Sequence, residues 1–478
     1  MRRISIDTLG LTSPRSSTFS PTRRRASWYS SRPKLLTTFC FFGLLYLYFN
    51  FGGTPVFIPE DSYEYLQDES LKDILNTTLG FQKILVLNIP YRTDRRDATT
   101  LSAALSNITV DFIPGVTGDS IHQKAYPPPQ ESNIKLTKGI KGSWRTHMNA
   151  LQYIVEHNLT TAMIFEDDVD WDIRVRQNLQ RFALASRFLS ENHDALSANP
   201  RYKLDIRPNT ETPETTFHTL SLNGITDSLP SIPLKSIYTK RLRYPQHHAN
   251  HNAPTSPYGD PTQWDILWIG HCGAGFPRYP QTSRHKSDVS NANVLLTLPN
   301  DSTVPQPKWL KAHPFQGDLD PLASAYKPHT RIYHRATGGE LCTVGYAVSQ
   351  RGARRLLHQF GLKKWDGIFD GELGRWCAGE DDNPLNVPAS SSAADASKKR
   401  KPKGGKERVC LTSQPPIFAH HHPLDGESDI GGLGGGYAKG LETKYLRYSV
   451  RMNLERLVQG SWSGGSGEEG LVDQWPDE

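Results

Sequence analysis

Short apolar runs separated by polar turns recur along the middle of the chain. Ile84 to Ile89 is apolar except at Asn88, a pattern typical of a strand buried on both faces of a parallel sheet. Ala98 to Leu105 suits a helix, and Val110 to Ile113 suits a second strand, closed by Pro114. This order predicts a β-α-β unit.

Similar segments further along the chain predict the rest of the core. Apolar residues recur at helical spacing over 148–155, and the apolar run Thr161 to Phe165 follows as a strand. Asp265 to Ile269 and Leu341 to Ser349 are two more expected strands, the second followed by a helix over 353–357. The predicted fold class is therefore α/β, with a mostly parallel sheet flanked by helices.

Polar stretches flank and interrupt this pattern. Residues 56–80 suggest a stem, and residues 201–263, rich in Pro, Thr, Ser, Asn and His, suggest a long insertion. Residues 389–408 suggest a second insertion, and residues 459–478 a disordered Gly, Ser and acidic tail. The first insertion contains three histidines, for which a solvated loop is favoured over a metal site: His247, His248 and His251.

The amino-terminal region combines a basic stretch with an apolar one. Residues 1–34 carry eight Lys or Arg and one Asp, and Leu35 to Phe51 is uncharged. As a helix, the apolar run would be about 26 Å long, which suits a thin membrane. The positive-inside rule then predicts a single-pass type II anchor within residues 35–55, with a disordered cytosolic tail before it.

This topology places the main domain, residues 81–458, in the lumen of the endoplasmic reticulum or Golgi. A cleaved signal peptide is the alternative, disfavoured because no small-x-small cleavage site follows Phe51. The net charge of +6 does not suggest a nucleic-acid partner, because residues 1–34 alone contribute +7 and the remaining chain is close to neutral.

Modification sites and cysteines are consistent with a lumenal domain. Four Asn-x-Ser/Thr sequences are expected glycosylation sites: Asn76, Asn107, Asn158 and Asn300. Of five cysteines, Cys40 lies in the apolar run, and four others could form two disulfides with the pairing left open: Cys272, Cys342, Cys377 and Cys410. No Cys-x-x-Cys pair occurs, which disfavours a cysteine zinc site.

An acidic cluster, Glu166-Asp167-Asp168, begins where the Thr161 strand is expected to end. In open α/β sheets, ligands bind outside the carboxyl ends of strands. Three adjacent carboxylates repel one another, which raises their proton affinity unless a cation compensates. Mg²⁺ or Mn²⁺ would do so and commonly bridges to substrate phosphates. An exposed acidic turn or a helix cap is the alternative.

The order and spacing of three motifs resemble glycosyltransferase family 25, which includes collagen galactosyltransferases and bacterial lipopolysaccharide glycosyltransferases. The motifs are Ile84 to Arg96, then Gly142 to His147, then Ile164 to Val169. Fungal members also look similar around Trp264 to Gly273 and Gly345 to Ser349. The resemblance is good over about residues 82–180 and looser over about 264–460.

The resemblance implies a GT-A-like, Rossmann-like fold, an inverting transfer and a nucleotide-sugar donor, with UDP as the expected carrier. It places near the nucleotide Asn88, Arg92, Asp94, Arg95, Arg96 and Asp167. Glu166 and Asp168 would hold the metal, although the motif is Glu-Asp-Asp and leaves open which two acids do so. His147 matches the family's Ser-x-x-x-His element, either near the donor or as a buried histidine that orients the acidic loop.

An inverting transfer needs a base that takes the acceptor proton. The candidates are Asp366, Asp370 and Glu372, of which we choose Asp370, with surface carboxylates as the alternative. One of the three histidines before Pro423 could complete the metal shell, and we choose His421; a plain histidine-rich loop is the alternative.

The resemblance, together with the acidic cluster, implies a hexosyltransferase that uses Mn²⁺ or Mg²⁺ and moves a sugar, with galactose a candidate, to a glycan or glycoprotein acceptor. The alternatives are a catalytically inactive glycan-binding or partner protein with the same fold, and a nucleotide-sugar hydrolase. The sugar, the acceptor and the linkage depend on pocket shape, and they stay open, as does the oligomeric state.

Overall fold

The computed structural model describes the chain over residues 69–128, 136–191, 216–222, 225–239, 256–275, 294–313, 316–337, 340–379, 408–423, 429–430, 442–460 and 470–477. Three predicted features lie outside these ranges: the tail and anchor over residues 1–55, residues 389–407 of the second insertion, and the histidines His247, His248 and His251. Within them, no helix is both long and apolar enough to cross a membrane.

The core is a mixed sheet whose main path has the strand order β2-β1-β3-β12-β7-β13-β11-β8-β6-β5. Its strands are β1 (Lys83–Asn88), β2 (Asp111–Pro114), β3 (Thr161–Glu166), β5 (Thr216–Leu222), β6 (Ile225–Pro233), β7 (Ile266–Gly270), β8 (Leu295–Leu298), β11 (Arg331–Arg335), β12 (Gly345–Ser349) and β13 (Cys410–Gln414). Along this path, β12, β11 and β5 run against the direction that the other strands share. The sheet therefore fits the predicted α/β, Rossmann-like class.

Smaller strands branch from this sheet. β14 (Phe418–His422) pairs with β7, with β4 (Val169–Trp171) and with β15 (Glu442–Thr443). A separate hairpin joins β9 (Lys311–His313) and β10 (Gln316–Leu319).

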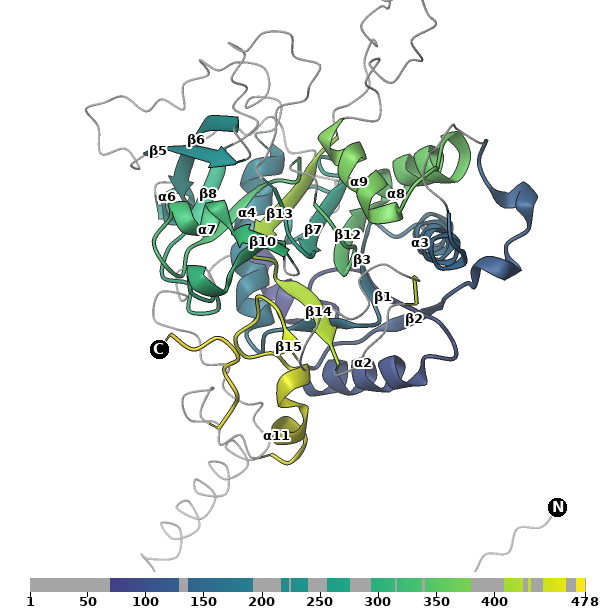
Figure 1. The fold of residues 1–478 in the computed structure, drawn as a ribbon, viewed down its shortest axis with the longest axis horizontal. Coiled ribbons are helices and arrows are strands. Elements are labelled where there is room, and N and C mark those ends of the chain that lie inside the picture. The colour runs from purple at the N-terminus through teal and green to yellow at the C-terminus, as the bar shows by residue number, and fades with distance from the viewer. Residues whose placement is uncertain are drawn as a thin grey trace, which may run out of the picture. The chain divides into compact units, whose positions relative to one another are not determined.

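Helices lie on both faces of the sheet (Figure 1). They are α2 (Thr93–Leu105), α3 (Lys138–Glu156), α4 (Val175–Glu191), α6 (Leu234–Thr239), α7 (Pro321–Ala325), α8 (Gln350–Leu356), the π-helix η8 (Leu357–Lys363), α9 (Phe369–Ala378) and α11 (Leu454–Val458). Short 3-10 turns are η3 (Glu69–Leu75), η4 (Gly118–Ser120), η5 (Gln123–Ala125), η7 (Pro307–Trp309) and η10 (Arg451–Asn453).

The two faces bury alternate residues of the same strands. Ile84 and Val86 of β1 join a cluster with α2 and α4, whereas Leu85 and Leu87 join a cluster with α3, α8 and α9. Because side chains alternate along a strand, a strand covered on both faces is apolar throughout. This explains the unbroken apolar runs, and it confirms the strands and helices expected over 84–113 and 161–165.

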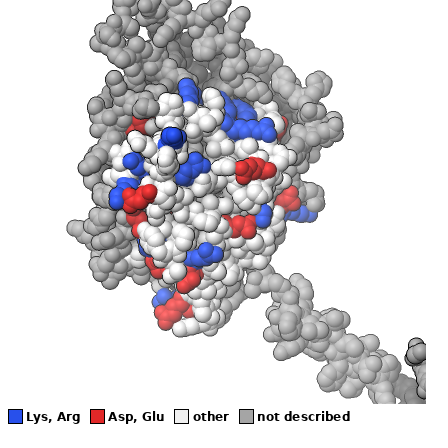
Figure 2. Space-filling view, turned by 90° about the vertical axis from the view of Figure 1, so that its right-hand side faces the viewer, with Lys and Arg blue, Asp and Glu red and all other residues white. Residues whose placement is uncertain are grey.

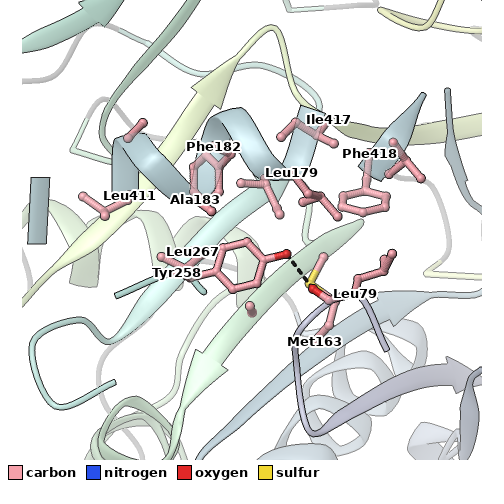
Figure 3. Close-up of a cluster of buried hydrophobic side chains, with 14 of the residues drawn as sticks. Leu79, Met163, Leu179, Phe182, Ala183, Tyr258, Leu267, Leu411, Ile417 and Phe418 are labelled. Carbon is pink, nitrogen blue, oxygen red and sulfur yellow. Dashed lines mark hydrogen bonds between the residues drawn. The ribbon is translucent and has the colours of Figure 1, made fainter. Parts of the chain in front are cut away.

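Three segments that composition marked as peripheral are partly packed into the fold. Within the expected stem, Leu71, Ile74 and Leu79 are buried, and the hydroxyl of Tyr258, from the expected insertion, donates to the Leu79 carbonyl at 2.7 Å (Figure 3). The insertion also contains β5, β6 and α6. In the expected tail, Trp475 Nε1 donates to the Thr443 carbonyl at 3.3 Å. Isolated aliphatic and aromatic residues in polar stretches provide these contacts, and average composition does not reveal them.

Candidate active site

Several strands have polar residues at the ends that lie along one edge of the sheet. β1, β3 and β7 run in one direction, so Asn88, Glu166 and Gly270 end their strands at this edge. β12 runs the opposite way, so Thr343, just before it, lies there too. β14 pairs with β4 and β7 and brings His420 to the same place. This is the position at which open α/β sheets bind ligands.

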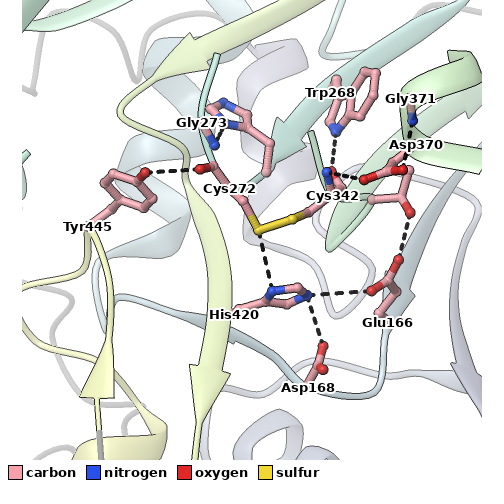
Figure 4. Close-up of a disulfide and its surroundings, with 12 residues drawn as sticks. Glu166, Asp168, Trp268, Cys272, Gly273, Cys342, Asp370, Gly371, His420 and Tyr445 are labelled. Atoms are coloured by element: carbon pink, nitrogen blue, oxygen red, sulfur yellow. Dashed lines mark hydrogen bonds and ion pairs between the residues drawn. A yellow bond between two sulfur atoms is a disulfide. The ribbon is translucent and has the colours of Figure 1, made fainter. Parts of the chain in front are cut away.

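Glu166, Asp168 and His420 form a group whose possible ligand atoms all lie within 4.8 Å of one another. Nε2 of His420 lies 3.5 Å from Oε2 of Glu166 and 3.4 Å from Oδ1 of Asp168 (Figure 4). Both acidic side chains are largely buried, at 23% and 17% exposed. Two carboxylates and one imidazole directed at one point are a donor set for a divalent cation.

Two oxygens at this edge are buried without a hydrogen bond among the described residues: Oδ1 of Asn88, and Oδ1 of Asp168, which has an ion-pair contact with His420 at 3.4 Å. The opposite ends of both side chains are occupied, because Oδ2 of Asp168 accepts from Arg95 at 2.9 Å and Nδ2 of Asn88 donates to Asp167 at 2.8 Å. Buried polar atoms are nearly always satisfied. These two oxygens therefore fit contacts to a bound ion or ligand.

The charges of the group compensate one another. Although burial opposes the charged form, hydrogen bonds with His147 and His420 hold the pKa of Glu166 well below its usual range. Burial would also raise the pKa of Asp168, but the charges of His420 and Arg95 lower it. In return, the two carboxylates raise the pKa of His420, which burial alone would lower. The raised proton affinity expected for the cluster is found at Asp167, where burial and the Asp168 charge raise the pKa.

Arg95 and Asn88 hold Asp167. One Arg95 nitrogen, NH1, donates to Oδ1 of Asp167 and to Oδ2 of Asp168, both at 2.9 Å. The pKa of Arg95 is raised because these two carboxylates outweigh its burial. The structure thus brings together the predicted residues Asn88, Arg95 and Asp167, and it places Glu166 and Asp168, not Asp167, beside His420.

A buried arginine binds the backbone of the segment that carries the acidic residues. Arg451 donates to the carbonyls of Val169 and Asp167, at 2.9 and 2.7 Å. Asp170 accepts from Thr443 Oγ1 at 2.7 Å and from the backbone N–H of Arg451 at 3.1 Å. Sequence reasoning missed Arg451, which lies 284 positions from Asp167 and in no recognised motif.

His147 is buried beside Glu166. Its Nδ1 lies 2.9 Å from the Tyr346 hydroxyl, and its Nε2 lies 3.3 Å from Thr343 Oγ1 and 3.6 Å from Glu166 Oε1. Thr343 Oγ1 in turn donates to Glu166 Oε1 at 2.6 Å. Of the two readings proposed for His147, this geometry favours a histidine that orients the acidic loop.

Among the three candidate bases, Asp370 lies on the side of the acidic group. Its Oδ2 accepts from the Cys342 N–H at 2.8 Å (Figure 4), and burial, with a contribution from the Glu166 charge, raises its pKa. Asp366 pairs with Lys364 at 3.1 Å, and Glu372 pairs with Arg375. The geometry therefore keeps Asp370 as the candidate.

His421 lies beside Asp170, with Nδ1 3.9 Å from Oδ2, and is not part of the group formed by Glu166 and Asp168. Its Nδ1 lies 3.0 Å from Thr443 Oγ1, and its pKa is lowered to about 4 by burial. Because neighbouring side chains of a strand point to opposite sides, one histidine of β14 faces the acids and the next faces away. The histidine that lies beside Glu166 and Asp168 is therefore His420, one residue before the one chosen from the sequence.

Arg92 and Asp94 lie outside the group. Arg92 donates to Asp94 at 2.7 and 2.9 Å and also pairs with Asp429. Arg96 lies over the ring of Phe112, at 4.4 Å. Of the residues predicted to lie near the nucleotide, Asn88 and Arg95 therefore contact the acidic residues. Arg92, Asp94 and Arg96 have other partners.

Two disulfides pair the four cysteines that follow the apolar run: Cys272–Cys342 and Cys377–Cys410. Both sulfurs near His420 are therefore oxidised and offer no thiolate to a metal. All four predicted glycosylation asparagines, Asn76, Asn107, Asn158 and Asn300, are exposed.

A cavity of about 320 Å³ is lined by residues of α8, η8 and α9 and by Arg408. Its lining is basic and includes Arg354, Arg355, Lys363, Trp376 and Arg408. Figure 2 shows Lys and Arg side chains gathered toward the top of this side of the molecule. None of the predicted site residues lines this cavity.

Known proteins show similarity to the region around the acidic group. The model of glycosyltransferase family 25, described as an LPS biosynthesis protein, matches residues 81–223. Procollagen galactosyltransferase 1-A of Xenopus laevis is 26% identical over 115 residues, which cover 21% of this chain and 18% of that protein. Procollagen galactosyltransferase 1 of Danio rerio is 22% identical over 182 residues, 33% of this chain and 30% of that protein.

A further relative is named as inactive. Inactive glycosyltransferase 25 family member 3 of Homo sapiens is 27% identical over 124 residues, 22% of this chain and 19% of that protein. The chain thus spans less than a third of the length of these relatives. The matched region contains β1, α2, α3, β3 and the acidic group's Glu166 and Asp168, so residues 81–223 are similar to glycosyltransferase family 25 in the part of the chain that holds the acidic group.

Proposed function

We propose that this chain is a metal-dependent glycosyltransferase that moves a sugar from a nucleotide-sugar donor, with UDP as the carrier, to a glycan or glycoprotein acceptor. The observation that carries the proposal is the group of Glu166, Asp168 and His420, in which Oδ1 of Asp168 is buried without a hydrogen bond. Galactose is the sugar to test first, because two similar proteins are named as galactosyltransferases.

The donor set favours Mn²⁺ over Mg²⁺. Mg²⁺ prefers a shell of oxygen atoms, whereas imidazole suits transition metals and carboxylates suit Mn²⁺. Glu166, Asp168 and His420 would hold the ion. When bound, the metal would neutralise the charge that develops on the departing diphosphate.

The chain's own residues supply positioning and proton transfer. Arg95 holds Oδ2 of Asp168, so that Oδ1 stays directed at His420. Asp370 takes the proton from the acceptor hydroxyl while that oxygen bonds to the sugar carbon and the bond to the diphosphate breaks, which inverts the carbon. Its raised pKa makes Asp370 a stronger base than an exposed aspartate.

We also propose a lumenal site of action, with a type II anchor at residues 35–55 in the Golgi or endoplasmic reticulum membrane. Two disulfides and four exposed asparagines in glycosylation sequences support an oxidising, glycosylating compartment.

A second candidate is a binding or partner protein without turnover. The similarity to a relative named as inactive favours it. Such a protein would bind metal and nucleotide without releasing diphosphate.

The deciding experiment offers the full chain a panel of nucleotide sugars with Mn²⁺ and measures diphosphate release and product mass, with and without glycan and glycoprotein acceptors. We expect release that depends on both Mn²⁺ and an acceptor. Release to water alone would indicate a hydrolase, and binding of Mn²⁺ and UDP without release would indicate a binding protein. A chain that binds neither would contradict the proposal.

A further inference from the structure

The Cys272–Cys342 disulfide lies at the edge of the sheet that carries the acidic group. Cys272 follows β7 and Cys342 precedes β12, two strands that are already paired at Gly270 and Gly345. The Cys272 N–H also donates to the Leu341 carbonyl at 2.9 Å. The disulfide thus fastens the two strand ends beyond the last pair of the sheet.

Three groups of the proposed site contact this disulfide or the residue beside it (Figure 4). Sγ of Cys272 lies 3.4 Å from Nδ1 of His420. The Cys342 N–H donates to Oδ2 of Asp370 at 2.8 Å. The next residue, Thr343, donates to Oε1 of Glu166 at 2.6 Å.

The backbone conformation of Cys342 is unfavourable by itself and depends on contacts with its surroundings. Cys342 has a φ of 63°, in the left-handed region that residues other than glycine seldom adopt. Its carbonyl accepts from Trp268 Nε1 at 2.9 Å. Such a conformation persists where the surroundings over-determine it, and the disulfide is one of the bonds that do so here. This conformation directs the Cys342 N–H at Asp370 while Thr343 reaches Glu166.

We propose that the Cys272–Cys342 disulfide is a positioning element of the metal site, which holds His420, Asp370 and, through Thr343, Glu166 in the arrangement that binds the ion. The inference rests on the proposed function of this site. It assigns no metal contact to the sulfurs. Its measurable consequence is that Mn²⁺ affinity falls when this disulfide is absent, by roughly 10- to 100-fold, as is usual when groups that orient metal ligands are lost.

The second disulfide provides a matched control. Cys377–Cys410 joins α9 to β13, and no residue of the acidic group contacts it in any interaction described above. In the full chain, C272A/C342A and C377A/C410A each remove one disulfide, and both should lower the melting temperature. Mn²⁺ affinity, measured by calorimetry and electron paramagnetic resonance on protein that circular dichroism shows to be folded, should fall in C272A/C342A and stay within about threefold of wild type in C377A/C410A. The resonance spectrum should also lose its imidazole nitrogen coupling in C272A/C342A.

If C272A/C342A does not fold, the same comparison uses the C377A/C410A protein, oxidised and folded, to which a phosphine reductant is added. A phosphine takes up one oxygen from water as the disulfide becomes two thiols. Mn²⁺ affinity should fall on reduction and recover on reoxidation. Equal loss of affinity in both double variants, or none in either, would overturn the inference. A wild-type chain that binds no Mn²⁺ would instead contradict the proposed function.

Discussion

His420 faces Asp168 across the acidic group, with Nε2 3.4 Å from Oδ1, while Arg95 holds the other oxygen of the same carboxylate at 2.9 Å. Asp168→Asn keeps the shape of the side chain and removes the charge that an ion requires. Mn²⁺ with UDP at 100 times its Kd should stabilise the wild type by about 2.7 kcal/mol. The variant should lose most of that gain and almost all transfer. Melting temperatures with and without Mn²⁺ and UDP, together with transfer rates, provide the check.

Asp366→Asn is the control for this change, because Asp366 pairs with Lys364 away from His420. If Asp168→Asn still gained stability from Mn²⁺ and UDP and still transferred sugar, the acidic group would be an ordinary polar turn.

His420 and His421 should respond differently to substitution. His420→Ala should weaken Mn²⁺ binding at least tenfold, since Nε2 of His420 faces both carboxylates. His421→Ala should leave Mn²⁺ affinity near wild type. It should lower the free energy of unfolding by about 0.5–1.5 kcal/mol, because it removes one hydrogen-bond partner of Thr443 Oγ1, which still donates to Asp170. Calorimetry and urea unfolding of both variants test this, and the reverse pattern would restore His421 as the ligand.

Asp370→Asn should lower kcat by roughly 10²-fold or more while Mn²⁺ and UDP affinities change little, because general-base assistance is typically worth 10²- to 10⁴-fold. Since burial raises the pKa of Asp370 above 3.8, the acid limb of the wild-type kcat/KM profile should lie above that value and disappear in the variant. Asp366→Asn and Glu372→Gln are the controls. A larger loss in either would move the role to that residue.

The pH dependence of stability should carry a contribution from Asp320. Burial raises the pKa of this carboxyl from 3.8 to about 6. The folded state therefore binds more protons than the unfolded state between about pH 4 and 6, and the contribution of Asp320 to stability falls as the pH rises through that window. Asp320→Asn cannot titrate. Its free energy of unfolding relative to wild type should rise by about 2–3 kcal/mol between pH 4 and 7.

Urea unfolding of the wild type and Asp320→Asn at several pH values measures this difference. Asn can still accept from the backbone N–H groups of Leu322 and Ala323, as Asp320 does at 2.9 and 3.4 Å. Parallel stability curves for the two proteins would show that Asp320 ionises normally in the folded state.

Expression in eukaryotic cells tests the proposed topology. Glycosidase treatment should increase gel mobility, because all four sequence-predicted asparagines are exposed. Protease added to sealed microsomes should remove a small amino-terminal piece and leave the main domain intact. Digestion of the main domain in sealed microsomes would show that the proposed orientation is wrong.

The sequence by itself determined the features that depend on neighbouring residues. The apolar runs of β1 and β3 identify strands buried on both faces, because each strand must cover two layers of helices. The position of Glu166 to Asp168 at the end of β3 follows from the same run, since ligand sites lie at the carboxyl ends of strands. Four cysteines also predicted two disulfides, although they allow three pairings.

Only the tertiary structure decided which distant residues complete the site. His420 and His421 are identical in type and adjacent, and the choice between them depends on how β14 pairs with β4, a register that three successive histidines do not reveal. His420 lies 254 positions from Glu166, Thr343 lies 177 positions from it, and Arg451 lies 284 positions from Asp167. Local periodicity constrains a residue through its neighbours in the chain. Contacts across such separations are set by the packing of the whole sheet, which brings the ends of β3, β12 and β14 to one edge.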